Sequence, residues 1–347
     1  MRGTIVINKR RIGKDCPCYI ILEAGVNFDD INGAKRLVDS AAAIGADCVK
    51  FQTFHAKTTV IRGTHLKDGR GMIDQYKEFM ESEEKQTEDF QKELFLYAAK
   101  KDITAFSTPS HFKDVDLLEK IARPPAYKLG SDDLTNIPLL KYIARLKKPM
   151  IISSGVSYLS EIDSAIRAIK EEGNSDAILL HCVSQYPARP EDMNLRTMQT
   201  LMKTFDVPVG LSDHTMTTSI PIAAVAMGAC VIEKHFTLKR EALGPDNFFS
   251  TMPYEMELII KGIRETEKAM GLPYKDVTDA EKGIRQVFKK SIYAVKDIKE
   301  GEMITEKNVD ILRPEGGIEP GLLQHIYGIR AQRRILKGEP IIWDCFK

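Results

Sequence analysis

The chain has 347 residues, and its 50 Lys and Arg against 49 Asp and Glu give a formal net charge of +1. This balance gives no sign of a nucleic-acid or acidic-membrane surface, so neither partner is expected. The longest apolar runs are too short for a membrane span or a signal peptide, which predicts a soluble protein. The six cysteines include no Cys-x-x-Cys pair, which indicates reduced thiols and a cytoplasmic location.

The first part of the chain predicts a barrel. After a short hairpin over residues 4–14, a unit repeats in which a β-rich run ends in polar residues and a segment with helical periodicity follows. Eight such units over roughly 250 residues favour a (β/α)₈ TIM barrel over an open doubly wound sheet. The hairpin is expected to plug the bottom of the barrel. The predicted strands are residues 19–25, 48–54, 104–109, 126–131, 149–155, 177–184, 208–214 and 231–238.

The pattern changes near residue 275, which ends the predicted catalytic barrel domain of residues 1–275. Residues 276–287 are interpreted as a linker, and residues 288–347 alternate short β-like runs with turn signals. A β-rich domain of roughly 60 residues is marginal alone, so it is expected to pack on the barrel or on a neighbouring subunit. Within the barrel, the long connection from His55 to about Glu84 is predicted to cover the mouth with Tyr76, Phe79 and Met80.

Polar residues fall at the ends of all eight predicted strands. In barrels of this type the active site lies at the carboxyl ends of the strands. The polar residues are Glu23, Lys50 and Gln52, Ser107 and Thr108, Lys128 and Ser131, Ser153 and Ser154, His181 and Ser184, Ser212 and His214, and Glu233 and His235. The sequence therefore predicts a functional site at this end of the barrel.

Two histidines are candidates for a metal site. His214 and His235 close strands that follow one another in the sequence, so they are expected to converge. With the carboxylates of Glu23, Glu233 and Asp246 available, they predict a divalent ion with open positions for water and substrate. The alternative is that each histidine is a hydrogen-bonded structural residue.

Two lysines are candidates for anion binding. Lys50 and Lys128 are predicted to point into the barrel, where a lysine is rarely only structural. Two separate cations among hydroxyl groups predict a pocket for a small ligand with two anionic groups, such as a phosphorylated carboxylic acid. Two alternatives remain open: a Schiff-base lysine of an aldolase, and lysines that reach solvent or pair with Asp132 and Asp133. The hydroxyl groups expected nearby belong to Thr108, Ser131, Ser154 and Ser212.

Short motifs at these strand ends occur in a fixed order. They are Leu22-Glu-Ala-Gly-Val-Asn27, Val49-Lys-Phe-Gln52, Phe106-Ser-Thr-Pro109, Lys128-Leu-Gly-Ser131, Ile152-Ser-Ser-Gly155, His181-Cys-Val-Ser-Gln-Tyr-Pro187, Gly210-Leu-Ser-Asp-His-Thr215, Glu233-Lys-His-Phe-Thr237 and Gly244-Pro-Asp246. As a set they resemble the sialic acid synthase family. Members of this family carry a C-terminal antifreeze-like domain with a β-clip fold. Two motifs near the end of the chain resemble that domain: Val295-Lys-Asp-Ile-Lys-Glu-Gly-Glu302 and Leu312-Arg-Pro314.

The resemblance implies a reaction. Phosphoenolpyruvate would condense with N-acetylmannosamine and water to give N-acetylneuraminic acid and phosphate. A divalent ion, Mn²⁺ or else Mg²⁺ or Co²⁺, would be held by His214 and His235. The protein would be a domain-swapped homodimer in which each antifreeze-like domain caps the partner's barrel.

The resemblance also implies roles for single residues. Arg313 would reach across the dimer to the N-acyl group, and either Glu23 or Glu233 would act on the attacking water. The residues that would hold phosphoenolpyruvate are Lys50, Thr108, Lys128, Ser131, Ser154 and Ser212. Those that would face the sugar are Glu23, Gln52, Asp133, Tyr186 and Asp246, and Ser184 is also assigned to substrate binding.

The chain departs from the family pattern at three positions. Asn27 is followed by Phe28 and Asp246 by Asn247, where the family commonly has His, and Asp133 stands where the sialic acid branch often has Glu. A legionaminic or other diacetamido nonulosonic acid, made from a 2,4-diacetamido-trideoxy sugar, therefore remains open as the product. A Schiff-base aldolase and a carbohydrate- or ice-binding protein without activity are more distant alternatives.

Overall fold

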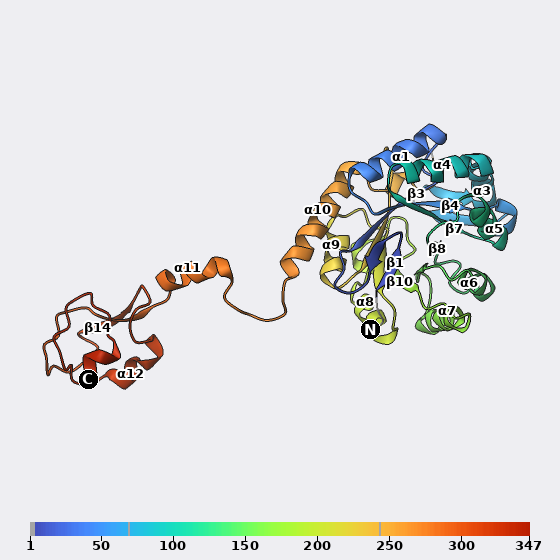
Figure 1. The fold of residues 1–347 in the computed structure, drawn as a ribbon. Coiled ribbons are helices and arrows are strands. Elements are labelled where there is room, and N and C mark those ends of the chain that lie inside the picture. The colour runs from blue at the N-terminus through green and yellow to red at the C-terminus, as the bar shows by residue number, and fades with distance from the viewer. Residues whose placement is uncertain (1–3, 69, 243) are drawn as a thin grey trace. The chain divides into compact units, whose positions relative to one another are not determined.

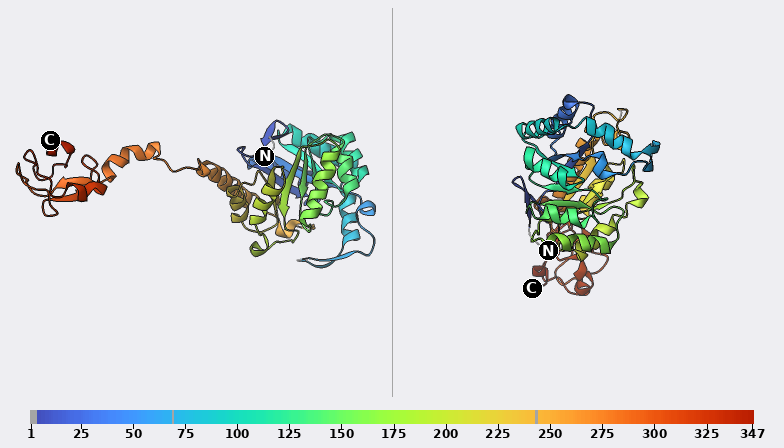
Figure 2. Two further views of the ribbon diagram at one scale, coloured as in Figure 1. Left: turned by 90° about the horizontal axis from the view of Figure 1, so that it is seen from below. Right: turned by 90° about the vertical axis from the view of Figure 1, so that its right-hand side faces the viewer.

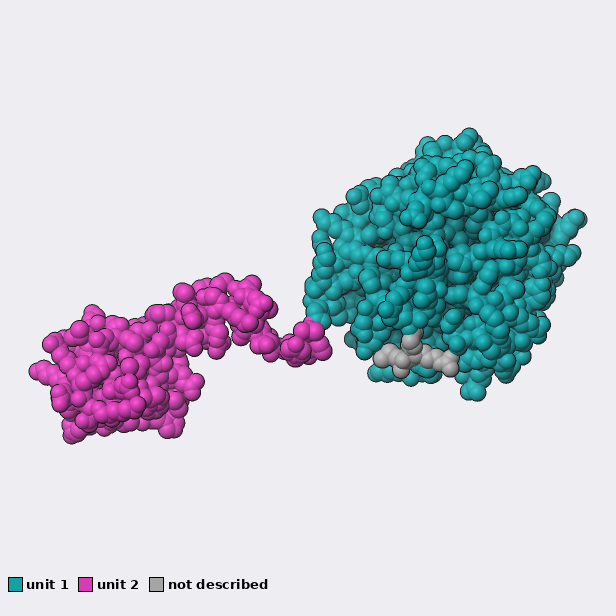
Figure 3. Space-filling view, in the orientation of Figure 1, with its two compact units in different colours: residues 1–271 teal, residues 272–347 magenta. Residues whose placement is uncertain are grey.

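The protein is described by a computed structural model that covers residues 4–68, 70–242 and 244–347. It divides into two compact units, Met1–Gly271 and Leu272–Lys347, which Figure 3 shows in separate colours. Within the described part of the chain, no helix is both long and apolar enough to cross a membrane.

The first unit is built on eight parallel strands, in the order β7-β4-β3-β12-β11-β10-β9-β8. The two strands at the ends of this order, β7 and β8, pack against each other, so the sheet curls round on itself (Figure 1). All eight predicted strands are present, and the predicted (β/α)₈ barrel is confirmed. The bounds are β3 (Tyr19–Gly25), β4 (Cys48–Thr53), β7 (Thr104–Pro109), β8 (Tyr127–Leu129), β9 (Met150–Ser153), β10 (Ala177–Cys182), β11 (Val209–Asp213) and β12 (Val231–His235).

Helices form a layer around the strands (Figure 2). Helix α1 shows why: Ala34, Leu37, Val38 and Ala41 recur at helical spacing and are all buried against the sheet. Helix starts are set by local caps, as in α6, where the side chain of Asn136 accepts from the backbone N–H of Leu139. The bounds are α1 (Ile31–Ala43), α4 (Glu88–Lys100), α5 (Phe112–Ile121), α6 (Ile137–Ala144), α7 (Leu159–Glu171), α8 (Arg196–Thr204), α9 (Ser219–Ala226) and α10 (Pro253–Met270).

An N-terminal hairpin fills the amino end of the barrel interior. Its strands are β1 (Ile5–Ile7) and β2 (Arg10–Ile12), and Ile7 and Ile12 are completely buried. Ile5, Ile7 and Ile12 form one apolar cluster with side chains from the barrel strands. Those partners are Tyr19, Ile21, Cys48, Phe106, Ala126, Ile151, Ile178, Leu180, Cys230 and Val231. The hairpin therefore lies where the sequence pattern places it.

The long connection after β4 has secondary structure of its own. It contains α2 (Ala56–Thr59), the hairpin of β5 (His65–Asp68) and β6 (Gly71–Asp74), and α3 (Gln75–Glu84). The ring of Phe79 packs edge-on against Phe54, with ring centroids 4.7 Å apart. This contact draws α3 toward the carboxyl end of β4.

The second unit is a small β-rich domain, as the sequence predicts. It contains β13 (Ser291–Ala294), β14 (Val309–Leu312) and α12 (Leu323–Ile326) around an apolar cluster that includes Ile292, Ile298 and Ile335. The segment interpreted as a linker, residues 276–287, lies largely within helix α11 (Asp279–Phe288). A capping box begins this helix, because Thr278 Oγ1 accepts from the Glu281 N–H while the Glu281 carboxylate accepts from the Thr278 N–H.

Candidate active site

A cavity of about 370 Å³ opens at the carboxyl ends of the barrel strands. Side chains alternate along a strand, so the residues that face this cavity come two positions after those that face the hairpin plug. Ile21 is followed in this way by Glu23, Cys48 by Lys50, and Val231 by Glu233. The predicted residues that line the cavity are Glu23, Lys50, Gln52, Thr108, Lys128, Ser131, Ser184, Tyr186, Ser212, His214, Glu233, His235 and Asp246.

Two buried lysines and two buried glutamates share the floor of the cavity. Lys50 Nζ lies 2.7 Å from Glu23 Oε2 and 3.9 Å from Glu233 Oε2, while Lys128 Nζ lies 3.5 Å from Glu233 Oε1. Ser212 Oγ donates to Glu233 Oε1 over 3.0 Å. Glu233 thus lies between the two cations, and the four charges balance. The predicted alternative in which the lysines reach solvent does not fit, because both are almost fully buried.

The pKa values of the two glutamates are shifted in opposite directions. Burial raises the pKa of Glu23, and the nearby Lys50 only partly opposes this effect. Burial also acts on Glu233, but Lys128 and Lys50 outweigh it and hold the pKa of that carboxyl below its usual range. Paired carboxyl groups whose pKa values are driven apart are typical of acid–base sites, with one group exchanging protons while the other stays ionised.

The pKa values of the two lysines are also shifted in opposite directions. Burial lowers the pKa of Lys128. Burial also disfavours the charged form of Lys50, but Glu23 and Glu233 outweigh it and raise the pKa of Lys50. Lys50 also donates to Thr108 Oγ1 over 3.0 Å.

The two histidines converge as predicted, with ring centroids 5.3 Å apart. Nδ1 of His214 bonds the carbonyl oxygen of Val183 over 2.8 Å and therefore carries a proton. Burial lowers the pKa of His214, but the Cys182 thiol and the Val183 carbonyl outweigh burial and raise it, so Nε2 has a lone pair in the neutral form of the ring. Nδ1 of His235 is buried and makes no hydrogen bond with a described residue, and Asp246 Oδ2 lies 3.5 Å away. Burial lowers the pKa of His235 well below its ordinary value, which favours the neutral imidazole that binds metal ions.

These donors could accept a divalent ion together with substrate or water. Metal binding requires both imidazoles in the neutral form, and two imidazole ligands leave several coordination positions open, as a Lewis-acid site requires. Among the described residues, no group of three or more His, Cys, Asp or Glu lies in an arrangement that could hold a metal by itself.

Two of the residues of unit 1 that were predicted to bind substrate, Asp133 and Ser154, lie outside the lining of this cavity. Asp133 Oδ1 accepts from Asn136 Nδ2 over 2.9 Å, and its neighbour Asp132 lines the cavity instead. Ser154 Oγ donates to the carbonyl oxygen of Leu180 over 2.8 Å. Burial and the charge of Asp132 raise the pKa of Asp133 to about 6.

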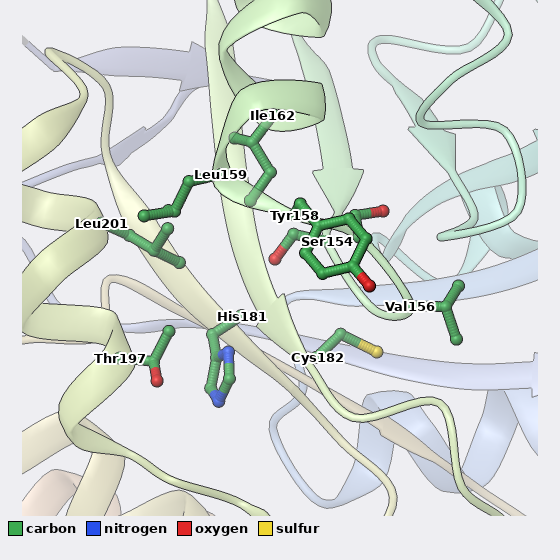
Figure 4. A pocket seen from close by; sticks show the side chains of 10 residues that line it. Ser154, Val156, Tyr158, Leu159, Ile162, His181, Cys182, Thr197 and Leu201 are labelled. Carbon is green, nitrogen blue, oxygen red and sulfur yellow. The ribbon is translucent and has the colours of Figure 1, made fainter.

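Ser154 faces a second cavity, of about 470 Å³, which is lined by residues of α7 and α8 and shown in Figure 4. Its predecessor Ser153 faces the first cavity, where Ser153 Oγ accepts from Lys128 Nζ over 2.8 Å. Successive residues of a strand face opposite sides, so a shift of one position exchanges the two cavities.

Arg313, the predicted contact to the N-acyl group, belongs to unit 2. Its guanidinium lies over the ring of Phe288, 4.8 Å from the centroid. The role predicted for it therefore depends on a second subunit or on the arrangement of the two units.

Sequence reasoning missed several residues that line the first cavity. Cys182 follows Leu180 in the inward register of β10, so the two-residue period could have found it. Burial raises the pKa of its thiol, but the neighbouring His214 and weaker effects outweigh burial and bring it to about 7. Arg70 and Glu78 come from the long connection and form an ion pair over 2.6 Å. No strand periodicity marks these two residues.

None of the three departures from the family pattern lines the cavity, since Asp133 lies outside it as described above and Phe28 and Asn247 do too. Phe28 is buried and stacks on Phe90, with ring centroids 5.3 Å apart. The side chain of Asn247 is buried and accepts from Thr237 Oγ1 over 2.5 Å. Since neither residue lines the cavity, these two departures carry little information about the sugar.

Comparisons with known proteins agree with this architecture. Residues 37–275 match the NeuB family, and residues 289–347 match the SAF domain. The chain is 39% identical to the N,N'-diacetyllegionaminic acid synthase of Campylobacter jejuni, over 93% of this chain and 98% of that protein. It is 38% identical to the enzyme of the same name from Legionella pneumophila, over 96% and 95%. The solved N-acetylneuraminic acid synthetase of Leptospira borgpetersenii has a TM-score of 0.73 and 31% identity, over 82% and 95%.

A (β/α)₈ barrel with paired lysines and carboxylates at its carboxyl end, joined to a SAF domain, defines a class of condensing synthases. The chain belongs to the NeuB family. It is accordingly a phosphoenolpyruvate-dependent transferase that forms a carbon–carbon bond. The predicted family, with its C-terminal antifreeze-like domain, is confirmed.

Proposed function

We propose that this enzyme joins C3 of phosphoenolpyruvate to the aldehyde carbon of an N-acylated sugar of the mannosamine type. Water adds at C2, phosphate leaves, and the product is a nine-carbon α-keto acid, a nonulosonic acid. The observation that carries the proposal is the pair of buried lysines, Lys50 and Lys128, in the cavity of a NeuB-family barrel. Two fixed cations suit the carboxylate and the phosphate of phosphoenolpyruvate.

The surrounding hydroxyl groups support this binding mode. Thr108 and Ser153 already accept hydrogen bonds from Lys50 and Lys128, which holds each ammonium group in place. Ser131 Oγ accepts from the N–H of Gly155 over 2.9 Å and also lines the cavity. Because the two ammonium groups and the neighbouring hydroxyl groups are held in place before the substrate arrives, little side-chain entropy is lost on binding.

We infer that His214 and His235 hold a divalent ion, with Mn²⁺ as the first candidate and Mg²⁺ or Co²⁺ as alternatives. Two observations support this assignment: Nε2 of His214 has a lone pair in the neutral ring, and Nδ1 of His235 makes no hydrogen bond with a described residue. When bound, such an ion would polarise the aldehyde oxygen of the sugar. The ring of Tyr186, 4.3 Å from that of His214 between centroids, would help to exclude water from the same region.

Glu23 is proposed as the group that takes the proton from the attacking water. Its pKa is raised by burial, so it exchanges a proton more readily near neutral pH than an ordinary carboxylate. Gln52 Nε2 donates to Glu23 Oε1 over 2.8 Å and fixes the carboxyl group. Glu233 would remain ionised and hold Lys50 and Lys128 apart.

Two acceptor sugars fit this reaction. N-acetylmannosamine would give N-acetylneuraminic acid, and a 2,4-diacetamido-trideoxy sugar would give a legionaminic-type acid. The second is supported by the two relatives named N,N'-diacetyllegionaminic acid synthase, at 39% and 38% identity, against 31% for the solved N-acetylneuraminic acid synthetase. Phe54, Phe79 and Phe248 add apolar surface to the cavity, which suits a sugar with fewer hydroxyl groups.

The decisive experiment offers phosphoenolpyruvate and Mn²⁺ with each acceptor in turn and identifies the product by mass spectrometry. We expect phosphate release only when both a sugar and the metal ion are present. Turnover that survives EDTA would contradict the metal role of His214 and His235. A pyruvate adduct trapped by borohydride on Lys50 or Lys128 would instead favour a Schiff-base aldolase.

A homodimer in which Arg313 reaches the partner's sugar site is a further part of the proposal, supported by the family resemblance. Arg313→Ala is expected to raise the KM for the sugar and to leave the KM for phosphoenolpyruvate unchanged. Arg330→Ala, on the same unit, is the control. An unchanged sugar KM in the Arg313 variant would remove the cross-subunit role.

A further inference from the structure

A buried ion pair lies behind the two histidines, on the side of the strands that faces away from the cavity. Lys234 Nζ is 2.6 Å from Asp213 Oδ2, and the two side chains are only 3% and 0% exposed. The pair joins neighbouring strands, since Asp213 of β11 is paired in register with Lys234 of β12. Neither residue lines the cavity, and the proposed reaction makes no direct use of them.

The position of each residue in its strand is informative. Asp213 stands between Ser212 and His214, and both of these neighbours face the cavity. Lys234 stands in the same way between Glu233 and His235. Because side chains alternate along a strand, the pair directly backs four residues of the site.

The ion pair also holds the backbone on both sides of His214. Asp213 Oδ1 accepts from the N–H of Thr215 over 2.9 Å, and Lys234 Nζ donates to the carbonyl oxygen of Thr215 over 2.5 Å. The residues that flank His214 are thus tied to one cation from the next strand. On the cavity side, the carbonyl of His214 accepts from the N–H of Ala188 over 3.0 Å.

Stability alone does not account for a pair of this kind. Removing two charges from water costs several kcal/mol per ion, and well-packed apolar residues of similar volume often serve stability equally well. A charged pair with directed hydrogen bonds does, however, fix geometry, and residues behind metal-binding histidines commonly set the orientation of the ring.

We propose that Asp213 and Lys234 are positioning residues that fix the separation and orientation of His214 and His235. The proposal rests on the proposed role of these histidines in holding a divalent ion. It predicts that the pair can be replaced without loss of the fold, but not without loss of the histidine geometry.

The test uses the full-length double variant Asp213→Leu/Lys234→Met, which replaces the ion pair by apolar side chains. We expect it to fold, with Mn²⁺ affinity measured by equilibrium dialysis weakened by roughly 10- to 100-fold. In the metal-free protein, ¹⁵N–¹H spectra of the imidazoles should show that the His214 signal has lost its single Nδ1–H form. If the double variant does not fold, Asp213→Asn replaces it, since this change keeps an acceptor for the Thr215 N–H.

A matched control lies before β4, at the opposite end of the strands. Asp47 Oδ2 accepts from the N–H of Ile20 over 2.9 Å, and the carboxylate pairs with Arg264 over 3.4 Å and with the half-exposed Arg10 over 2.7 Å. Asp47→Leu/Arg264→Met is expected to leave Mn²⁺ affinity within about twofold of the wild type, because Asp47 precedes β4 and Arg264 belongs to α10, so neither adjoins the histidines in its element.

The two readouts separate this inference from the proposed function. A folded variant with unchanged imidazole signals and unchanged Mn²⁺ affinity would overturn the positioning role. Changed imidazole signals in a protein whose wild type binds no Mn²⁺ would support the positioning role and overturn the metal role of the histidines.

Discussion

The two ends of the barrel interior are built from the same strands and differ in almost every physical property. At the amino end, Ile21 and Val231 pack against the isoleucines of the hairpin. Two residues further along the same strands, Glu23 and Glu233 belong to a cluster of buried charges. One end is closed by an apolar plug, and the other opens into a cavity.

This difference separates stability from function within one barrel. Each apolar side chain buried at the closed end contributes about 1.5–3 kcal/mol. The charges at the open end are costly to desolvate and are held by partners that a substrate can replace. Substitutions at the open end should therefore lower activity, whereas substitutions at the closed end should lower stability alone, and the following variants test this in order of expected effect.

The largest effect is expected for Lys128→Met. Burial disfavours the charged form of Lys128, but its removal leaves the buried carboxylate of Glu233 with Lys50 as its remaining cation. Loss of one partner of a buried ion pair is destabilising, so the melting temperature should also fall. The kcat/KM for phosphoenolpyruvate, measured by phosphate release, should fall roughly 10³-fold, because the transition state loses a stabilising cation. Lys120→Met, at an exposed lysine paired with Glu88, is the control. A loss of less than tenfold would mean that Lys128 does not bind the substrate.

At the closed end, Ile12→Ala should lower stability and leave activity unchanged. Ile12 is completely buried in the plug, so its truncation should cost about 3 kcal/mol of unfolding free energy. The kcat/KM of the folded enzyme should stay within about twofold, because no substrate contact changes. Val6→Ala, at a residue 54% exposed in the same hairpin, should change neither quantity. A fall in kcat at full folding would show that the two layers are coupled.

The stability of the open end should depend on pH through Asp246. Burial raises its pKa to about 7, whereas an unfolded aspartate titrates near about 3.9. Between these pH values the native state binds more protons than the unfolded state, so the unfolding free energy falls as the pH rises. The cost is absent below about pH 4 and complete above about pH 7.

Asp246→Asn should remove this dependence in metal-free enzyme. The side chain keeps 19% of its exposed area and solvent screens part of the charge, so we expect the variant to gain on the order of 2 kcal/mol at pH 8 and nothing at pH 4. Denaturant unfolding at the two pH values measures the difference. Equal stabilities at pH 8 would indicate that Asp246 ionises there without penalty.

The sequence predicts the barrel and most of its site for a simple physical reason. Strand periodicity determines which residues face inward, so Lys50, Ser212 and Glu233 could be placed from spacing alone. The pattern is weaker where a strand ends. β8 ends at Leu129, so the side taken by Asp133 depends on loop geometry that periodicity does not determine. Ser154 follows the last residue of β9, and the alternation that turns Ser153 toward the first cavity turns Ser154 away from it. Arg70 and Glu78 come from a connection whose path depends on contacts such as Phe54 with Phe79.

The smallest predicted effect tests this boundary between strand and loop. Ser153 Oγ accepts from Lys128 Nζ in the first cavity, so Ser153→Ala should leave the ammonium group less well oriented and lower kcat/KM roughly tenfold. Ser154 Oγ bonds the carbonyl of Leu180 and faces the second cavity, so Ser154→Ala should stay within about threefold. Each serine is the control for the other, since they are adjacent and equally small. A larger loss of kcat/KM in Ser154→Ala than in Ser153→Ala would mean that Ser154 contacts phosphoenolpyruvate. The end of β9 would then have to rotate when the substrate binds.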